Sequence, residues 1–204
     1  MNIYLVSSLI GAKTQLESYI KDFPSREIVF IPTASLKSPT TKYVDEAREY
    51  FNDHGFIIKD LEVSTTSEDE AKKVIENADI LYLSGGNSFY LLQELKKKNL
   101  LELIKKRVEA DMVYIGESAG AIIAGPNIEY SKYMDEISEG PELTSYDALN
   151  IVDFYLVPHY GEEPFVKEAK KIVGLYGEVL DLVAIDNQSA VVVTNGNFIY
   201  ILEI

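Results

Sequence analysis

The stretch Met112-Val-Tyr-Ile-Gly-Glu-Ser-Ala-Gly-Ala-Ile-Ile-Ala124 decides the fold of this chain. It opens with an apolar, β-prone run, turns at Gly116–Gly120 and continues with small residues suited to the start of a helix. A strand, a tight glycine-flanked turn that carries a serine, and a helix together form the nucleophile elbow, in which small neighbours let strand and helix approach closely. The stretch therefore predicts a parallel sheet with the Ser118 hydroxyl at the carboxyl end of a strand; an ordinary strand-to-helix turn is the alternative interpretation.

Segments typical of strands and of helices alternate on both sides of this stretch. We expect strands over 2–6, 27–32, 56–63, 79–83, 112–115, 154–157, 181–185, 190–194 and 198–202, and helices over 14–21, 43–54, 68–78, 88–98, 101–109 and 164–176. This alternation predicts an α/β fold in one catalytic domain, 1–204, with a mainly parallel sheet covered on both faces. Asn195-Gly196 predicts a hairpin turn between the last two strands.

Composition narrows the classes of function. The formal charge of −14 argues against nucleic acid, because phosphate binding needs a basic face. No apolar run approaches the roughly 18 residues that a membrane span needs, and the first residues lack the basic region of a signal peptide, so we expect a cytoplasmic protein without a membrane partner. The absence of cysteine removes disulfides and thiolate nucleophiles.

Three loops follow predicted strands, namely Ser84–Asn87, Gly116–Gly120 and Pro158–Tyr160. Ligands of open α/β sheets bind outside the carboxyl ends of the strands. We therefore expect the three loops to meet at one edge of the sheet and to form the functional site there.

A serine nucleophile needs a base, and the chain has two histidines. His54 precedes Gly55 at the end of a predicted helix, where a histidine suits the last carbonyls. His159 lies just past a strand, beside Pro158, and is the candidate base; a hydrogen-bonded loop histidine is the alternative interpretation.

The imidazole in turn needs a group that holds its tautomer. In enzymes with a nucleophile elbow the acid typically follows the serine and precedes the histidine. The candidates in that interval are Glu129, Asp135, Glu136, Glu139, Glu142, Asp147 and Asp153. Their spacing does not select one of them.

The glycines of Gly85-Gly86-Asn87 leave backbone amides uncovered after a strand. The Gly86 and Ala119 amides could converge on one oxygen and form an oxyanion hole. The alternative interpretation is a simple turn with Asn87 as the cap of the next helix, and both can hold together.

Four motifs resemble, in order, those of the peptidase E (aspartyl dipeptidase) family of serine peptidases, which includes the cyanophycinases. They are Leu83-Ser-Gly-Gly-Asn87, Gly116-Glu-Ser-Ala-Gly-Ala121, Ser145-Tyr-Asp-Ala-Leu149 and Val157-Pro-His-Tyr160, and the resemblance extends over nearly the whole chain. It implies a three-layer α/β/α sandwich similar to the class I glutamine amidotransferases. It also implies catalysis by Ser118 as nucleophile and His159 as base.

The same resemblance assigns the remaining roles. The acid of the family lies after the elbow helix, where Tyr133-Met-Asp135 is the best match; Asp135 is our choice and the adjacent Glu136 the reserve. The oxyanion donors are Gly86 and Ala119. We expect Asn87, Glu117 and Tyr160 to bind the substrate.

One departure from the family concerns specificity. Peptidase E prefers an amino-terminal Asp, whose carboxylate an Arg downstream of the catalytic His helps to bind, whereas Arg26, Arg48 and Arg107 all precede His159 here. Lys167, Lys170 or Lys171 could substitute for the Arg but would not reproduce its bidentate geometry, so the preference for Asp stays open. We expect hydrolysis of small peptides through an acyl-enzyme, without a metal or cofactor. An esterase with the same triad and an inactive ligand-binding domain are the alternatives, and assembly into a homo-oligomer is compatible with the sequence.

Overall fold

The computed structural model describes residues 1–194 and 197–201, so the predicted Asn195-Gly196 turn lies outside the described residues. Its main sheet has seven strands in the order β3-β2-β4-β5-β1-β8-β9. The strands are β1 (Asn2–Val6), β2 (Glu27–Ile31), β3 (Ile57–Asp60), β4 (Ile80–Leu83), β5 (Val113–Glu117), β8 (Ala190–Thr194) and β9 (Asn197–Ile201). The first five are parallel to one another, β8 pairs antiparallel with β1, and β9 pairs antiparallel with β8. The sequence predicted such a mainly parallel sheet with a final antiparallel strand pair.

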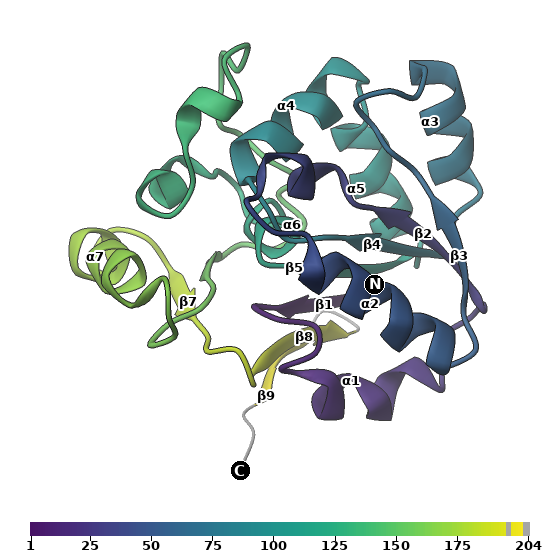
Figure 1. Ribbon diagram of the computed structural model, residues 1–204, viewed down its shortest axis with the longest axis horizontal. Coiled ribbons are helices and arrows are strands. Elements are labelled where there is room, and N and C mark those ends of the chain that lie inside the picture. Colours follow the sequence, from purple (N-terminus) through teal and green to yellow (C-terminus); the bar gives the residue numbers. More distant parts are fainter. Residues whose placement is uncertain (195–196, 202–204) are drawn as a thin grey trace.

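Helices cover both faces of this sheet, with α1 and α2 on one side and α3, α4 and α5 on the other (Figure 1). The helices are α1 (Lys13–Ile20), α2 (Lys42–Asp53), α3 (Glu68–Glu76), α4 (Ser88–Lys97), α5 (Leu101–Glu109), α6 (Ala119–Ile122) and α7 (Val166–Tyr176). Short 3-10 helices span Thr33–Lys37, Glu129–Tyr133 and Ile137–Glu139. Within the described residues, no helix is both long and apolar enough to cross a lipid bilayer.

The strands are apolar on both faces because both faces are covered. In β1, Ile3 and Leu5 pack into the layer that contains α3 to α6, while Tyr4 and Val6 pack against α1 and α2. All four side chains are buried. Successive side chains of a strand point to opposite faces, so a continuous apolar run is what a doubly covered strand requires.

The turn between β5 and α6 is packed backbone against backbone. A Cβ added at Gly120 would lie 2.3 Å from the Leu83 carbonyl oxygen, and one added at Gly116 would lie 2.5 Å from the Gly120 carbonyl oxygen. No side chain fits in either place. The two glycines therefore set how closely α6 approaches β4 and β5, and with it the position of Ser118.

One part of the topology differs from the sequence-based expectation of a single sheet. Strands β6 (Tyr155–Val157) and β7 (Leu182–Ala184) pair in parallel with each other and form a separate two-stranded sheet. In Figure 1, α7 and β7 lie to one side of the main sheet. Both edges of β5 are paired with β4 and β1, and the second edge of β1 is paired with β8, so the centre of the main sheet offers no place for β6.

We expect Gly120→Ala to lower the free energy of unfolding by about 1–3 kcal/mol, because its methyl group must displace the Leu83 backbone. Gly174→Ala is the matched control: this glycine lies within α7 with no atom near its added Cβ, so the change should stabilise the chain by about 0.5–1 kcal/mol. Urea unfolding of both variants measures the difference. Equal stability of the two would contradict the packing described here.

Candidate active site

Three neighbouring strands end at the same edge of the main sheet. Strands β4, β5 and β1 are adjacent and parallel, so their carboxyl ends carry Ser84–Gly86, Ser118 and Ser7 side by side. The Ser118 amide continues the β-ladder by donating to the Val6 carbonyl at 2.9 Å. The edge that the sequence predicted as the functional site thus holds the candidate nucleophile.

Ser118 has the strained backbone of a nucleophile elbow. Its φ of 47° and ψ of −103° lie in a region that residues with a side chain rarely adopt. A Cβ added at Gly85 would lie 3.3 Å from the Ser118 Cβ, so a glycine at that position keeps the space beside the hydroxyl open. The Ser118 side chain is half-buried and faces a cavity.

His159 reaches Ser118 from the small sheet, just past the end of β6. Its φ is 58°, and its amide donates to Ser7 Oγ at 2.9 Å. The Ser7 hydroxyl in turn donates to the Ile185 carbonyl at 3.1 Å, so one serine fastens the end of β1 to the ends of β6 and β7. The imidazole also stacks on Phe165, with ring centroids 5.0 Å apart.

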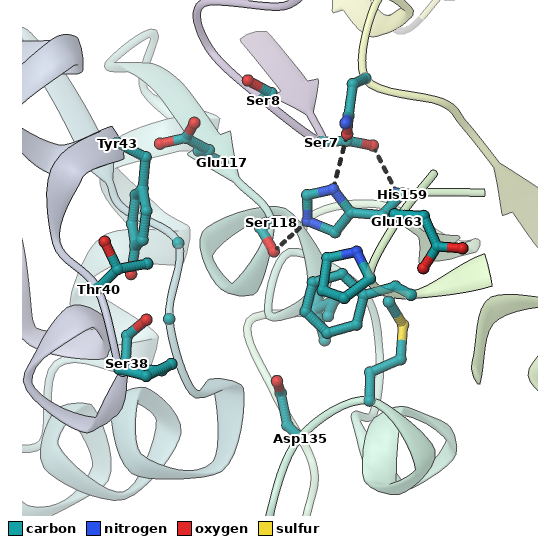
Figure 2. A pocket seen from close by; sticks show the side chains of 18 residues that line it. Ser7, Ser8, Ser38, Thr40, Tyr43, Glu117, Ser118, Asp135, His159 and Glu163 are labelled. Atoms are coloured by element: carbon teal, nitrogen blue, oxygen red, sulfur yellow. Dashed lines mark hydrogen bonds between the residues drawn. The ribbon is translucent and has the colours of Figure 1, made fainter. Parts of the chain in front are cut away.

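The imidazole is hydrogen-bonded on both nitrogens. Nε2 lies 3.0 Å from Ser118 Oγ, and Nδ1 lies 2.7 Å from Oδ1 of Asn187 (Figure 2). An amide oxygen only accepts, so Nδ1 carries the proton and Nε2 presents its lone pair to the serine hydroxyl. Burial lowers the pKa of His159, against the raising effects of the Asn187 hydrogen bond and of Glu162.

Asn187 is held in place by its own loop and by the N-terminal segment. The Asp186 carboxylate accepts hydrogen bonds from the amides of Gln188 and Ser189 at 3.0 and 2.8 Å. A Cβ added at Gly11 would lie 2.0 Å from the Asn187 carbonyl oxygen, so the two backbones are in direct contact. This packing fixes the amide that orients the imidazole.

The choice of Asp135 as the group behind the imidazole was wrong, because Asn187 occupies that position. The Asp135 carboxylate instead accepts from the Ser88 amide at 2.9 Å, in the first turn of α4. Glu136, the reserve, is exposed, and its carbonyl accepts from the Asn87 side chain at 3.0 Å.

Glu117 precedes the nucleophile and is buried. Its carboxylate accepts from the Leu9 amide at 2.7 Å, from the Tyr82 hydroxyl and from the Gly85 amide. Burial raises the pKa of Glu117 to about 7, against these three hydrogen bonds, which lower it. Glu117 lines the cavity, and its hydrogen bonds tie the loops after β1 and β4 to β5.

The other expected site residues are divided between the cavity and its surroundings. Gly86 lines the cavity, and Ala119 follows Ser118 as the first residue of α6. Asn87 does not line it: its side chain caps α4 by accepting from the Tyr90 amide at 2.8 Å. Tyr160 is exposed and does not line it either. His54 ends α2 as predicted, with Nδ1 2.7 Å from the Tyr50 carbonyl oxygen.

Sequence reasoning missed Asn187 and Ser7. The predicted candidates for the third group are carboxylates between the serine and the histidine, whereas Asn187 is an amide that follows the histidine. A signal was present, since Asn187 follows the predicted strand 181–185 much as His159 follows 154–157.

The cavity around Ser118 has a volume of about 340 Å³. Among the described residues, its walls carry three carboxyl groups, those of Glu117, Asp135 and Glu163, and no lysine or arginine. In the part of the chain that the structure describes, no cluster of three or more His, Asp or Glu side chains is arranged to hold a metal ion.

Comparisons with known proteins identify the family of the chain. A model of peptidase family S51 matches residues 4–201. The uncharacterized peptidase PM1590 of Pasteurella multocida strain Pm70 is 42% identical over 193 residues, which cover 95% of this chain and 93% of that protein. Peptidase E of Nostoc sp. strain PCC 7120 is 34% identical over 152 residues, which cover 74% of this chain and 59% of that protein.

A solved structure extends the likeness to the fold. A protein from Listeria monocytogenes EGD-e, provisionally described as a peptidase E, matches with a TM-score of 0.92 and 36% identity over 98% of this chain and 96% of that one. The predicted α/β/α sandwich and the resemblance to the peptidase E family are both confirmed. Because the family model spans nearly the whole chain, the chain belongs to peptidase family S51 and is a peptidase of the serine type.

Proposed function

We propose that this chain, as one catalytic domain, hydrolyses small peptides such as dipeptides through an acyl-enzyme on Ser118. The observation that carries the proposal is the line of hydrogen bonds from Ser118 through His159 to Asn187, beside a cavity. A volume of about 340 Å³ lies near the lower end of the usual range for ligand sites, which suits a substrate of a few residues. Relatives named peptidase E support the same chemistry.

In the first half of the reaction, the Ser118 oxygen attacks the carbonyl carbon of the peptide bond while Nε2 of His159 takes the hydroxyl proton. The Gly86 and Ala119 amides donate to the oxygen that becomes negative. The carbon–nitrogen bond then breaks, and the proton on Nε2 passes to the leaving amine. The products of this half are a free amine and an ester on Ser118.

In the second half, water attacks the ester while Nε2 takes one of its protons. The carbon–oxygen bond to Ser118 then breaks, and the proton returns from Nε2 to the serine oxygen. Asn187 keeps the imidazole in the required tautomer throughout, but as a neutral amide it adds no charge to stabilise the imidazolium. This arrangement differs from a triad that ends in a carboxylate.

Ser118→Ala should abolish hydrolysis of a dipeptide panel while leaving the unfolding midpoint close to that of the unmodified chain, because the variant lacks only the attacking oxygen. Removal of a catalytic serine in a comparable triad lowers kcat by about 10⁶-fold. Release of amino acids, measured by ninhydrin, reports the loss. Retained turnover in the variant would rule out the acyl-enzyme.

A fluorophosphonate probe and an ester panel distinguish the two alternative functions. Only an activated serine reacts with the probe, so the unmodified chain should be labelled and Ser118→Ala should not. An absence of labelling in the unmodified chain would favour an inactive ligand-binding domain. Turnover of esters without any turnover of peptides would favour an esterase.

The value of kcat/KM should fall as the pH is lowered, with the midpoint of the fall below pH 6.5. Burial lowers the pKa of His159 below its ordinary value, and Nε2 accepts the serine proton only while the imidazole is neutral. Below the midpoint, kcat/KM should drop at least tenfold for each pH unit. Profiles of kcat/KM between pH 4 and 9 measure this, and a midpoint above 7 would contradict the assignment.

Asn187→Asp should raise the pKa of His159 by roughly one to three pH units, because it places a negative charge beside Nδ1. NMR titration of the His159 imidazole protons measures the change. The acid-side midpoint of kcat/KM should rise by the same amount. An unchanged pKa of His159 would mean that Asn187 does not contact the imidazole.

A further inference from the structure

Asp135 is a cavity-lining carboxylate that the proposed reaction does not use. It lines the same cavity as Ser118, and Figure 2 shows its carboxyl group directed toward the serine. Its carboxylate accepts hydrogen bonds from the amide and the hydroxyl of Ser88. An ionised carboxylate has about four acceptor sites, so Ser88 leaves part of the capacity of Asp135 open to the cavity.

No cation compensates this charge in the described part of the chain. Asp135 forms no ion pair there, and no lysine or arginine lines the cavity. Burial raises the pKa of Asp135 to about 6, despite its hydrogen bonds to Ser88. Asp135 is half-buried at the cavity wall, and a carboxylate partly removed from water without a cation is unfavourable. A cationic group brought by a ligand would relieve that cost.

The other two carboxylates of the cavity are less suited to such a role. Glu117 is already engaged by three donors, from Leu9, Tyr82 and Gly85. Glu163 is exposed, so water screens its charge. Among the three, Asp135 is the half-buried carboxylate whose hydrogen bonds leave acceptor capacity open to the cavity.

We propose that Asp135 is a specificity-determining residue that binds the α-ammonium group of the substrate, so the cavity takes peptides with a free amino end. The inference rests on the proposed function, since the α-nitrogen of an amino-terminal residue is two bonds from the carbonyl carbon that Ser118 attacks. An ammonium group beside Asp135 and a carbonyl beside Ser118 therefore belong in one cavity.

The same charges set the preference for the first side chain. The three carboxyl groups of the cavity repel an acidic side chain, and no lysine or arginine among the described lining residues could form an ion pair with it. The substrate class is thus a small peptide with a free amino terminus and an uncharged or basic first residue.

Binding to the full-length Ser118→Ala protein tests the inference without any turnover. Isothermal titration at pH 7.5 compares Leu-Leu with N-acetyl-Leu-Leu and with Asp-Leu. A charge-assisted hydrogen bond makes a difference of roughly tenfold to a hundredfold, so Leu-Leu should bind tighter than the acetylated peptide by that factor. Asp-Leu should also bind more weakly than Leu-Leu.

Asp135→Asn, added to the Ser118→Ala protein, should bring the dissociation constants of Leu-Leu and N-acetyl-Leu-Leu to a ratio of about one. Asparagine can still accept from the Ser88 amide, so the end of α4 keeps its hydrogen bond. Glu136→Gln is the matched control, because it removes the same charge from the adjacent, exposed residue and should change the ratio by less than about threefold. Asp135→Glu keeps the carboxylate and should retain part of the discrimination.

Equal binding of the free and acetylated peptides by the Ser118→Ala protein would overturn the inference, even if Asp135→Asn failed to fold. A ratio that survives Asp135→Asn would overturn it as well. Turnover by the unmodified chain is a separate measurement. If Leu-Leu binds tighter than its acetylated form but the unmodified chain hydrolyses no peptide, binding of the amino end by Asp135 is supported and the peptidase mechanism is ruled out.

Discussion

The hydrogen bond between Ser118 and His159 joins two parts of the molecule that are built separately. Ser118 belongs to the main sheet, at the end of β5, whereas His159 belongs to the two-stranded sheet of β6 and β7. The bond depends on how these sheets are placed, and Ser7 fixes that placement by bonding to both His159 and Ile185. A site assembled across two sheets is therefore as rigid as the contacts at their carboxyl ends.

Close backbone packing holds both reacting residues in uncommon conformations. Ser118 and His159 both have positive φ values, which cost roughly 1–3 kcal/mol each and persist only where the surroundings over-determine them. Around Ser118 those surroundings are Gly116 and Gly120, where no Cβ fits. Around His159 they are the Ser7 hydrogen bond and the Phe165 ring. The strain at the site is thus balanced by packing that only small residues and short contacts allow.

The electrostatics of the cavity follow from neutral groups next to the imidazole and acidic groups further away. Asn187 orients the imidazole without a charge, and burial keeps the pKa of His159 low. Glu117 and Asp135 have raised pKa values because both carboxyl groups are removed from water. Burial thus favours a neutral imidazole, while the proposed preference for a free amino end rests on the carboxyl groups of the cavity.

By itself the sequence determined the alternation of strands and helices, the elbow at Ser118 and the choice of His159, because these depend on local periodicity, glycine spacing and a chain with two histidines. Only the tertiary structure decided that β6 and β7 leave the main sheet, and that Asn187 rather than Asp135 stands behind the imidazole. Strand pairing and side-chain contacts between distant segments depend on which edges remain free and on how loops pack. Asn187 and Asp135 both lie more than 20 residues from His159 in the chain. Local sequence patterns therefore do not show which of the two contacts the imidazole.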